Sequence, residues 1–256
     1  MNLHMWRAAV VVAVFSLGGF APAKASEIKV LTAGAFKQVV LALVPDFQKQ
    51  TGHMVSVDNG TTGELKKRID GGEAFDVVVI TPAVVDEFIA SGKVAAGSRL
   101  MLASVGIGAA VKEGAPKPDI STVEAFKQAL LAAKSVSYID PASGGSSGIY
   151  IDKLLVKLGI ADEVRPKAKL KQGGHVADYI KSGEAELGIH QISEIVPVKG
   201  VTLVGPLPKE IQNITVYAGG LSATTKNKEA ADEFLHYLSG PDAAAVLKSK
   251  GMDKAT

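Results

Sequence analysis

Short apolar runs alternate along the chain with segments whose apolar residues recur at helical spacing. Three such runs cover residues 28–32, 54–57 and 75–80. They predict buried strands, and the stripe from Phe36 to Phe47 predicts a helix between the first two. Pro45 lies inside this stripe and predicts a kink or a local break. Thr61-x-x-Glu64 matches a capping box and predicts a second helix to about residue 70. Strands alternating with helices are typical of a parallel sheet covered on both faces.

The same alternation restarts after residue 120. Ser121-x-x-Glu124 is a second capping box and predicts a helix start. Strands are expected at 135–139 and 187–189, with helices at 149–158 and 176–182. The second half therefore has its own set of strands and helices.

Two long β-type runs, residues 99–111 and 214–222, lie between these sets and predict chain crossings between two lobes. Asn227 is expected to cap a C-terminal helix over 228–238. The predicted fold class is α/β, with each lobe a mainly parallel sheet flanked by helices and a ligand cleft between the lobes. Residues 26–106 form the first part of lobe 1 and 107–213 form lobe 2. Residues 214–256 supply the crossover strand and the helices that return to lobe 1.

Residues 1–25 have the pattern of a cleavable signal peptide, with Arg7, an apolar stretch and the small-x-small site Ala23-Lys-Ala25. Without Arg7 and Lys24, the 28 basic residues fall to 26, equal to the 26 acidic residues. A mature chain of zero formal charge argues against nucleic acid as a partner. Any anionic ligand must then be held by local donors.

The chain has no cysteine, which excludes disulfides, thiolate metal sites and cysteine nucleophiles. His175 and His190 have no acidic residue at metal-ligand spacing, so no metal or other cofactor is expected. Aromatic residues make up only 5% of the chain, which disfavours stacking platforms for sugars or bases.

Three loops rich in small and hydroxyl residues follow predicted strands: 33–35, 60–63 and 143–148. In open α/β sheets, ligands bind where strands lead into helices. Backbone N–H groups and the helix dipole at such positions favour an anion. Because the loops come from both halves, they predict a clamp that closes on a small anion.

The chain resembles the type II class of bacterial periplasmic solute-binding proteins, nearest the molybdate-binding group of ABC importers. The resemblance covers the mature chain and rests on segments 28–36, 60–65, 69–78, 140–150 and 183–189. It implies a two-lobed periplasmic receptor, most simply a monomer, that delivers its ligand to an ABC permease without chemistry. The implied ligand is a molybdate- or tungstate-like oxyanion or a small di- or tricarboxylate.

The resemblance also implies a set of ligand-binding residues. They are Ala35 with Phe36 beside it, Thr61, Thr62, Ser146, Ser147, Val176, His190 and Gln191. Alanine at 35 replaces a family serine, and Gln191 replaces a family tyrosine. Losing one hydroxyl and gaining an amide and an imidazole favours a larger, more asymmetric anion, and the choice between oxyanion and carboxylate stays open.

Other interpretations compete at these positions. Residues 144–148 match G-x-S-x-G, so Ser146 could be the nucleophile of a secreted serine hydrolase with Asp178 and His190. The separation of the motif from the preceding strand by Pro141 fits that arrangement poorly. The threonines could serve only as helix caps, and His190 could be a packed histidine. A sensor subunit that works without a transporter is a further alternative.

Overall fold

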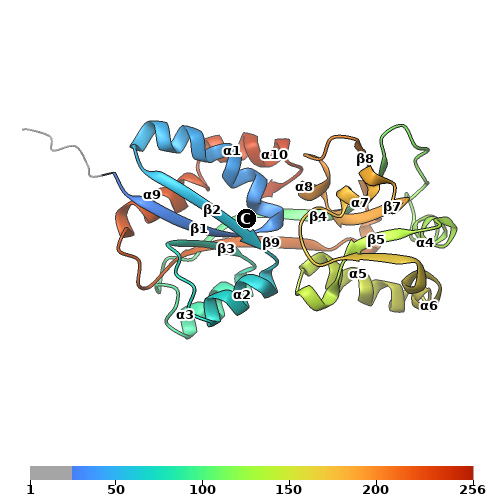
Figure 1. The fold of residues 1–256 in the computed structure, drawn as a ribbon, viewed down its shortest axis with the longest axis horizontal. Helices are drawn as coiled ribbons and strands as arrows, with labels where there is room; N and C mark the ends of the chain where they lie inside the picture. Colours follow the sequence, from blue (N-terminus) through green and yellow to red (C-terminus); the bar gives the residue numbers. More distant parts are fainter. Residues whose placement is uncertain (1–24, 256) are drawn as a thin grey trace, which may run out of the picture.

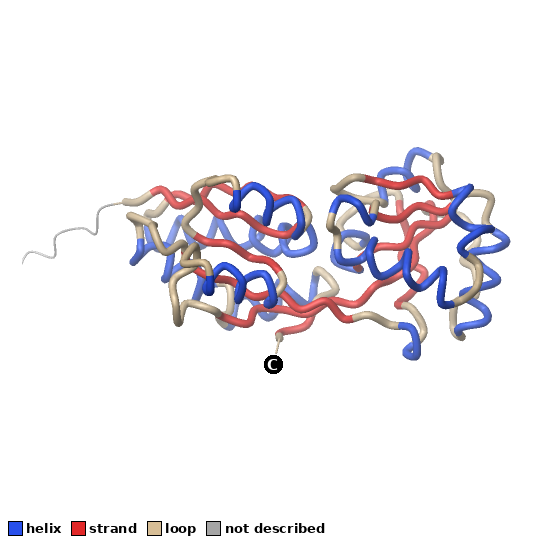
Figure 2. The backbone as a smooth tube through the Cα atoms, turned by 90° about the horizontal axis from the view of Figure 1, so that it is seen from below, coloured by secondary structure: helices blue, strands red, loops and turns tan. Residues whose placement is uncertain are grey.

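The structure is a computed structural model that describes residues 25–255. Two α/β lobes lie side by side, and two long strands run between them (Figures 1 and 2). Within residues 25–255, no helix is both long and apolar enough to cross a membrane. The predicted signal peptide lies almost wholly outside the described residues.

The first lobe is built on three parallel strands, β1 (Glu27–Ala33), β2 (Met54–Gly60) and β3 (Val77–Ile80). Helices α1 (Gly34–Thr51), α2 (Thr62–Asp70) and α3 (Pro82–Ala90) follow these strands in turn. The apolar face of α1 packs on one side of the sheet, while α2 and α3 cover the other (Figure 1). The strand–helix alternation predicted from the sequence is confirmed here.

The strands β4 (Leu100–Lys112) and β9 (Ile214–Leu221) connect the lobes. β9 pairs antiparallel with β3, and the first half of β4 pairs antiparallel with β9. The second half of β4 pairs with β7 and β8 of the second lobe. The sheet is therefore continuous between the lobes, in the order β2-β1-β3-β9-β4-β7-β5-β6. The boundaries at 106/107 and 213/214 remain sequence-based predictions.

The second lobe is a smaller sheet with helices on its faces. Its strands are β5 (Val136–Ile139), β6 (Ala168–Lys171), β7 (Leu187–Gln191) and β8 (Val201–Pro206). Its helices are α4 (Val123–Ala132), α5 (Ser146–Lys157), α6 (Ala161–Val164), α7 (Ala177–Ser182) and α8 (Ile192–Ile195). Three 3₁₀ turns span Pro141–Ser143, Arg165–Lys167 and Lys209–Ile211. A separate apolar core around Phe126, Tyr138 and Leu154 holds this lobe together.

The C-terminal segment packs on the first lobe. Helices α9 (Lys228–Tyr237) and α10 (Pro241–Ser249) pack on the same core as α1, and β10 (Asp253–Lys254) pairs with β4. The rings of Phe47 and Phe234 meet edge to face, with their centroids 4.8 Å apart. The two ends of the chain therefore share one hydrophobic core.

Local predictions fail where a side chain finds a different partner. Pro45 lies on the exposed face of α1 and the helix continues through it, so a local break is wrong and a kink stays a prediction. The cap of α4 is Thr122, whose hydroxyl accepts from the Ala125 N–H at 3.1 Å, and not Ser121. Asn227 stands at the N-cap of α9, but its amide donates to the Glu27 carbonyl at 2.8 Å instead of capping the helix.

Candidate functional site

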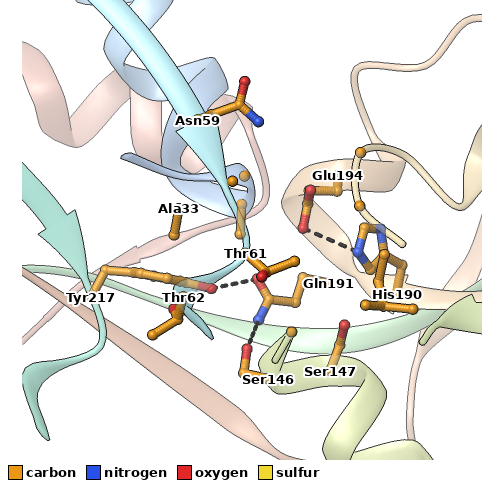
Figure 3. A pocket seen from close by; sticks show the side chains of 17 residues that line it. Ala33, Asn59, Thr61, Thr62, Ser146, Ser147, His190, Gln191, Glu194 and Tyr217 are labelled. Carbon is orange, nitrogen blue, oxygen red and sulfur yellow. Dashed lines mark hydrogen bonds and ion pairs between the residues drawn. The ribbon is translucent and has the colours of Figure 1, made fainter. Parts of the chain in front are cut away.

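Three helices begin at the cleft between the lobes, and each presents its N-terminus there. α1 and α2 belong to the first lobe and α5 to the second. A pocket lies between them, and residues from both lobes line it (Figure 3). Its lining consists of Ala33, Gly34, Ala35, Asn59, Gly60, Thr61, Thr62, Ile139, Gly145, Ser146, Ser147, Gly173, Gly174, His190, Gln191, Glu194 and Tyr217.

The pocket suits a small solute. Its empty volume is about 400 Å³, part of it open to solvent, which is within the range of small-molecule sites.

The N-termini of α1 and α5 lack an internal anion. Ala33 and Gly145 occupy their N-cap positions, and neither makes a side-chain cap hydrogen bond. Neither helix carries an acidic residue in its first turn. The first N–H groups of each helix therefore have no helical or capping acceptor, and the dipole favours a negative group in the pocket.

The two threonines at the start of α2 have different positions: Thr61 caps the helix and Thr62 lies in the pocket wall. The Thr61 hydroxyl accepts from the Glu64 N–H at 3.1 Å, which caps α2, and donates to the Ser143 carbonyl across the cleft. Thr62 lies in the pocket wall beside it (Figure 3). The capping prediction for Thr61 is confirmed, and ligand contact by Thr62 stays a prediction.

The lobes touch at a pair of glycines. The Gly63 N–H donates to the Gly144 carbonyl at 3.2 Å. A Cβ placed on Gly63 would lie 2.8 Å from the Gly144 Cα, closer than packed atoms allow. Only glycine permits this approach, so the cleft is closed along this rim.

Gln191 is the centre of a buried hydrogen-bond network. Its Nε2 donates to Ser146 Oγ at 2.8 Å and to Thr215 Oγ1 at 3.2 Å. The Tyr217 hydroxyl donates to Gln191 Oε1 at 2.7 Å, and burial raises the pKa of Tyr217, which keeps this donor protonated. The amide thus holds the hydroxyls of Ser146 and Tyr217 at the pocket (Figure 3).

A carboxyl–imidazole pair forms another wall. His190 Nε2 lies 3.1 Å from Glu194 Oε2, and their side chains are only 2% and 9% exposed. Burial lowers the pKa of His190 to about 3, helped by the nearby charges of His175 and Lys171. Burial raises the pKa of Glu194 to about 8, against a smaller opposing effect of Lys37. Both side chains are therefore neutral near pH 7.

Seven of the nine residues predicted from the sequence line the pocket: Ala35, Thr61, Thr62, Ser146, Ser147, His190 and Gln191. Phe36 and Val176 do not. Phe36 faces the core of the first lobe, where its ring centroid is 6.4 Å from that of Tyr217, and Val176 is buried at the start of α7. Ligand contact by the other seven stays a prediction.

Sequence reasoning missed Glu194 and Tyr217. Glu194 lies in α8, a helix of only four residues, so no periodic pattern marked it. The one sequence feature that could have indicated Glu194 is its position four residues after His190, just past the end of a predicted strand. Tyr217 lies within a crossing strand and reaches the pocket only because β9 passes beneath it.

The serine hydrolase alternative has no support. Ser146 Oγ is bonded to the Gln191 amide, which cannot act as a base. Asp178 pairs with Lys171 at 3.0 Å, and His190 pairs with Glu194. Ser146, Asp178 and His190 therefore each have a different partner and do not form a catalytic triad.

Two α/β lobes with an anion-type pocket at opposing helix N-termini define a two-lobed periplasmic binding protein of type II. A family model described as bacterial extracellular solute-binding protein matches residues 28–253, and the chain belongs to this family. The solved structure of the periplasmic molybdate-binding protein of Azotobacter vinelandii superimposes with a TM-score of 0.75 at 22% identity, covering 90% of this chain and all of that one.

Two curated relatives match nearly the whole chain. An aconitate isomerase from Pseudomonas sp. is 34% identical over 233 residues, covering 89% of this chain and 87% of that protein. The molybdate-binding protein ModA of Azotobacter vinelandii is 28% identical over 241 residues, covering 90% of each chain. The chain is thus a solute-binding protein of the ModA type, and the family supports a small anion as ligand and an ABC permease as partner.

Proposed function

We propose that this protein captures a small di- or tricarboxylate between its lobes and delivers it to an ABC permease. The observation that carries the proposal is the convergence of three helix N-termini, from both lobes, on one pocket. A ligand with two or three carboxylates would place one negative group near each of two or three N-termini.

The donors of the pocket also support an asymmetric anion. Thr62 and the α1 N-terminus lie on one wall, while Ser146, Ser147 and the α5 N-terminus lie on the opposite one. No lysine or arginine is among the lining residues. Uncharged, fixed donors recognise the positions of oxygen atoms and not only the total charge.

The test is a thermal-shift screen of the mature protein against citrate, malate, cis- and trans-aconitate, molybdate, tungstate, sulfate and phosphate. At a hundredfold excess over Kd, a ligand stabilises the protein by about 2.7 kcal/mol. For a protein of this size, that raises the Tm by about 5–10 °C. Stabilisation by carboxylates supports the proposal. Stabilisation by molybdate or tungstate alone contradicts it.

A second candidate function is isomerisation of the bound carboxylate. The 34% identical relative is an aconitate isomerase, and the pocket wall holds a carboxyl–imidazole pair able to exchange a proton. Such a reaction moves a proton from one carbon of an allylic unit to the other and shifts the double bond, with no oxidant or co-reactant. In this hypothesis the ionised form of Glu194 takes the proton from one carbon and returns it to the other, while His190 hydrogen-bonds the same carboxyl.

The test is incubation with cis-aconitate and detection of trans-aconitate by proton NMR. Interconversion by the wild type that is lost in Glu194→Gln supports the enzyme. Binding of aconitate without interconversion leaves the receptor as the function and rules out the isomerase.

A further inference from the structure

Glu194 places a carboxyl group in a pocket built for anions. It lies in α8, directly after β7, and its side chain reaches the N-terminus of α1 (Figure 3). A Cβ placed on Gly34 would lie 2.7 Å from Glu194 Oε1, so this oxygen is at the first turn of α1. If Glu194 were ionised, its charge would occupy the position that favours an anionic ligand and would repel that ligand.

The groups around Glu194 do not neutralise it by pairing. His190, from β7, is uncharged because burial lowers its pKa to about 3. The Nδ1 atom of His175 forms a hydrogen bond with the backbone carbonyl of Glu194, at 3.0 Å. Lys37, on α1, acts on the carboxyl only through a weak opposing charge effect.

Two further titratable groups lie close to the pair. Tyr217, from β9, carries no charge, since burial raises its pKa. Lys171, from β6, acts on His190 and pairs with Asp178 at 3.0 Å. Desolvation is therefore the largest influence on Glu194, and it raises the pKa of this carboxyl to about 8.

The contact with His190 decides which oxygen carries the proton. His190 Nε2 lies 3.1 Å from Oε2, and His190 Nδ1 is buried without a partner among the described residues. An unpaired buried acceptor costs less than an unpaired N–H, so the favoured tautomer has its proton on Nε2. His190 then donates to Oε2, and Oε1 is left to bear the acid proton beside the pocket.

We propose that Glu194 binds the ligand as a neutral carboxylic acid, donating its proton in a hydrogen bond to the anion, so that ligand binding requires a proton at this residue. This inference rests on the proposed function, because it concerns the same pocket and an anionic ligand. It assigns a ligand-binding role to a residue outside the family resemblance. It also makes affinity depend on pH in a range where the ligand itself does not titrate.

The direction of the dependence follows from charge. Below a pH of about 8 the acid form prevails and binding is at its strongest. Above that pH, Glu194 must take up a proton each time an anion binds, so affinity falls about tenfold per pH unit. Glutamine has the same shape, is neutral at every pH and still offers an N–H donor. Glu194→Gln is therefore expected to lose the dependence of affinity on pH.

The experiment measures Kd by titration calorimetry for citrate, trans-aconitate and molybdate between about pH 7 and about pH 9.5, where none of the three gains or loses a proton to a large extent. The wild type is expected to weaken by about tenfold or more over this range, while Glu194→Gln stays flat. The matched control is Glu64→Gln, which removes an exposed carboxylate in the first turn of α2 and is expected to weaken like the wild type.

A second measurement uses the wild type alone, in case Glu194→Gln does not fold. Calorimetry at about pH 8.5 in two buffers of different ionisation enthalpy gives the number of protons taken up on binding. We expect uptake of about 0.8 proton at about pH 8.5 and about 0.1 proton at about pH 7. Equal affinity at both ends of the range, or binding without proton uptake at the higher pH, would overturn the inference and leave the receptor function standing. No binding of any of these anions at any pH would instead remove the proposed function.

Discussion

The backbone N–H of Gly63 in the first lobe donates to the carbonyl of Gly144 in the second, at 3.2 Å. No side chain separates the lobes at this rim, and the Thr61 hydroxyl reaches the neighbouring Ser143 carbonyl. The closed state thus depends on an approach that only a missing Cβ allows.

Gly63→Ala is expected to hold the lobes apart, because its Cβ would lie 2.8 Å from the Gly144 Cα. Overpacking of this kind costs about 1–3 kcal/mol, so ligand affinity should fall about tenfold or more. Calorimetry measures the affinity, and small-angle X-ray scattering measures the radius of gyration with saturating ligand. Gly205→Ala is the control, since its Cβ would meet only Ile120 at 3.9 Å. An unchanged affinity in Gly63→Ala would show that closure does not need this contact.

Gln191→Leu should destabilise the protein and weaken binding together. The change leaves Ser146, Thr215 and Tyr217 without their shared amide partner. Buried polar groups left unpaired cost about 1–3 kcal/mol each, so urea denaturation should show a clear loss of stability. Tyr217→Phe removes one bond of the same network and should cost less, about 0.5–1.5 kcal/mol. Equal stability of Gln191→Leu and the wild type would contradict the network.

The stability of the ligand-free protein should depend on pH through the buried pair. Burial raises the pKa of Glu194 from 4.5 to about 8, so its stabilising contribution is complete below 4.5 and is lost as the pH rises to about 8. In that window the carboxyl is ionised in the unfolded chain and protonated in the folded protein. The free energy of unfolding therefore falls by about 1.4 kcal/mol per pH unit.

His190 acts in the opposite direction. Burial lowers its pKa from 6.5 to about 3, so its contribution is present above 6.5 and is lost as the pH falls to about 3. Glu194→Gln removes only the first effect. As the pH rises from about 5 to about 8, the free energy of unfolding of the variant should therefore increase relative to that of the wild type. Parallel urea titrations check this, and a constant difference across the range would show that Glu194 is ionised in the folded protein.

Ala35→Ser should move the ligand preference toward oxyanions. Ala35 lines the pocket and is 2% exposed, so a hydroxyl added there can donate to a bound ligand away from bulk water. One added hydrogen bond contributes about 0.5–1.5 kcal/mol, or about two- to tenfold in affinity for molybdate. Competition calorimetry against citrate gives the ratio. Ala83→Ser on the exposed face of α3 is the control, and an equal effect there would rule out a local cause.

The layout of the lobes was predictable because hydrophobic periodicity determines it. The strands before α1 and α2 and the crossing runs are where the pattern placed them. The strands β6 and β8 and the helix α3 had no expected counterpart. β6, with the sequence Ala-Lys-Leu-Lys, is largely polar and draws its stability from pairing with β5. Such pairing comes from tertiary context and leaves no periodic signal.

The site was predictable only where it coincides with helix starts. Thr61, Thr62, Ser146 and Ser147 stand at such positions, and the pocket formed between them. The helix α5 begins three residues before the predicted start at 149, because Gly145 and the serines serve as its first turn and not as a loop. Glu194 could not be identified as a candidate site residue from the sequence, because it belongs to no motif and is distinguished only by its burial beside His190.

The apolar face of α1 is covered by α9 and α10, and the rings of Phe47 and Phe234 meet there. The middle of the chain, in contrast, has a complete core of its own around Tyr138. During synthesis, the core beneath α1 can therefore be completed only after the last two helices have been made, whereas the second lobe does not need them.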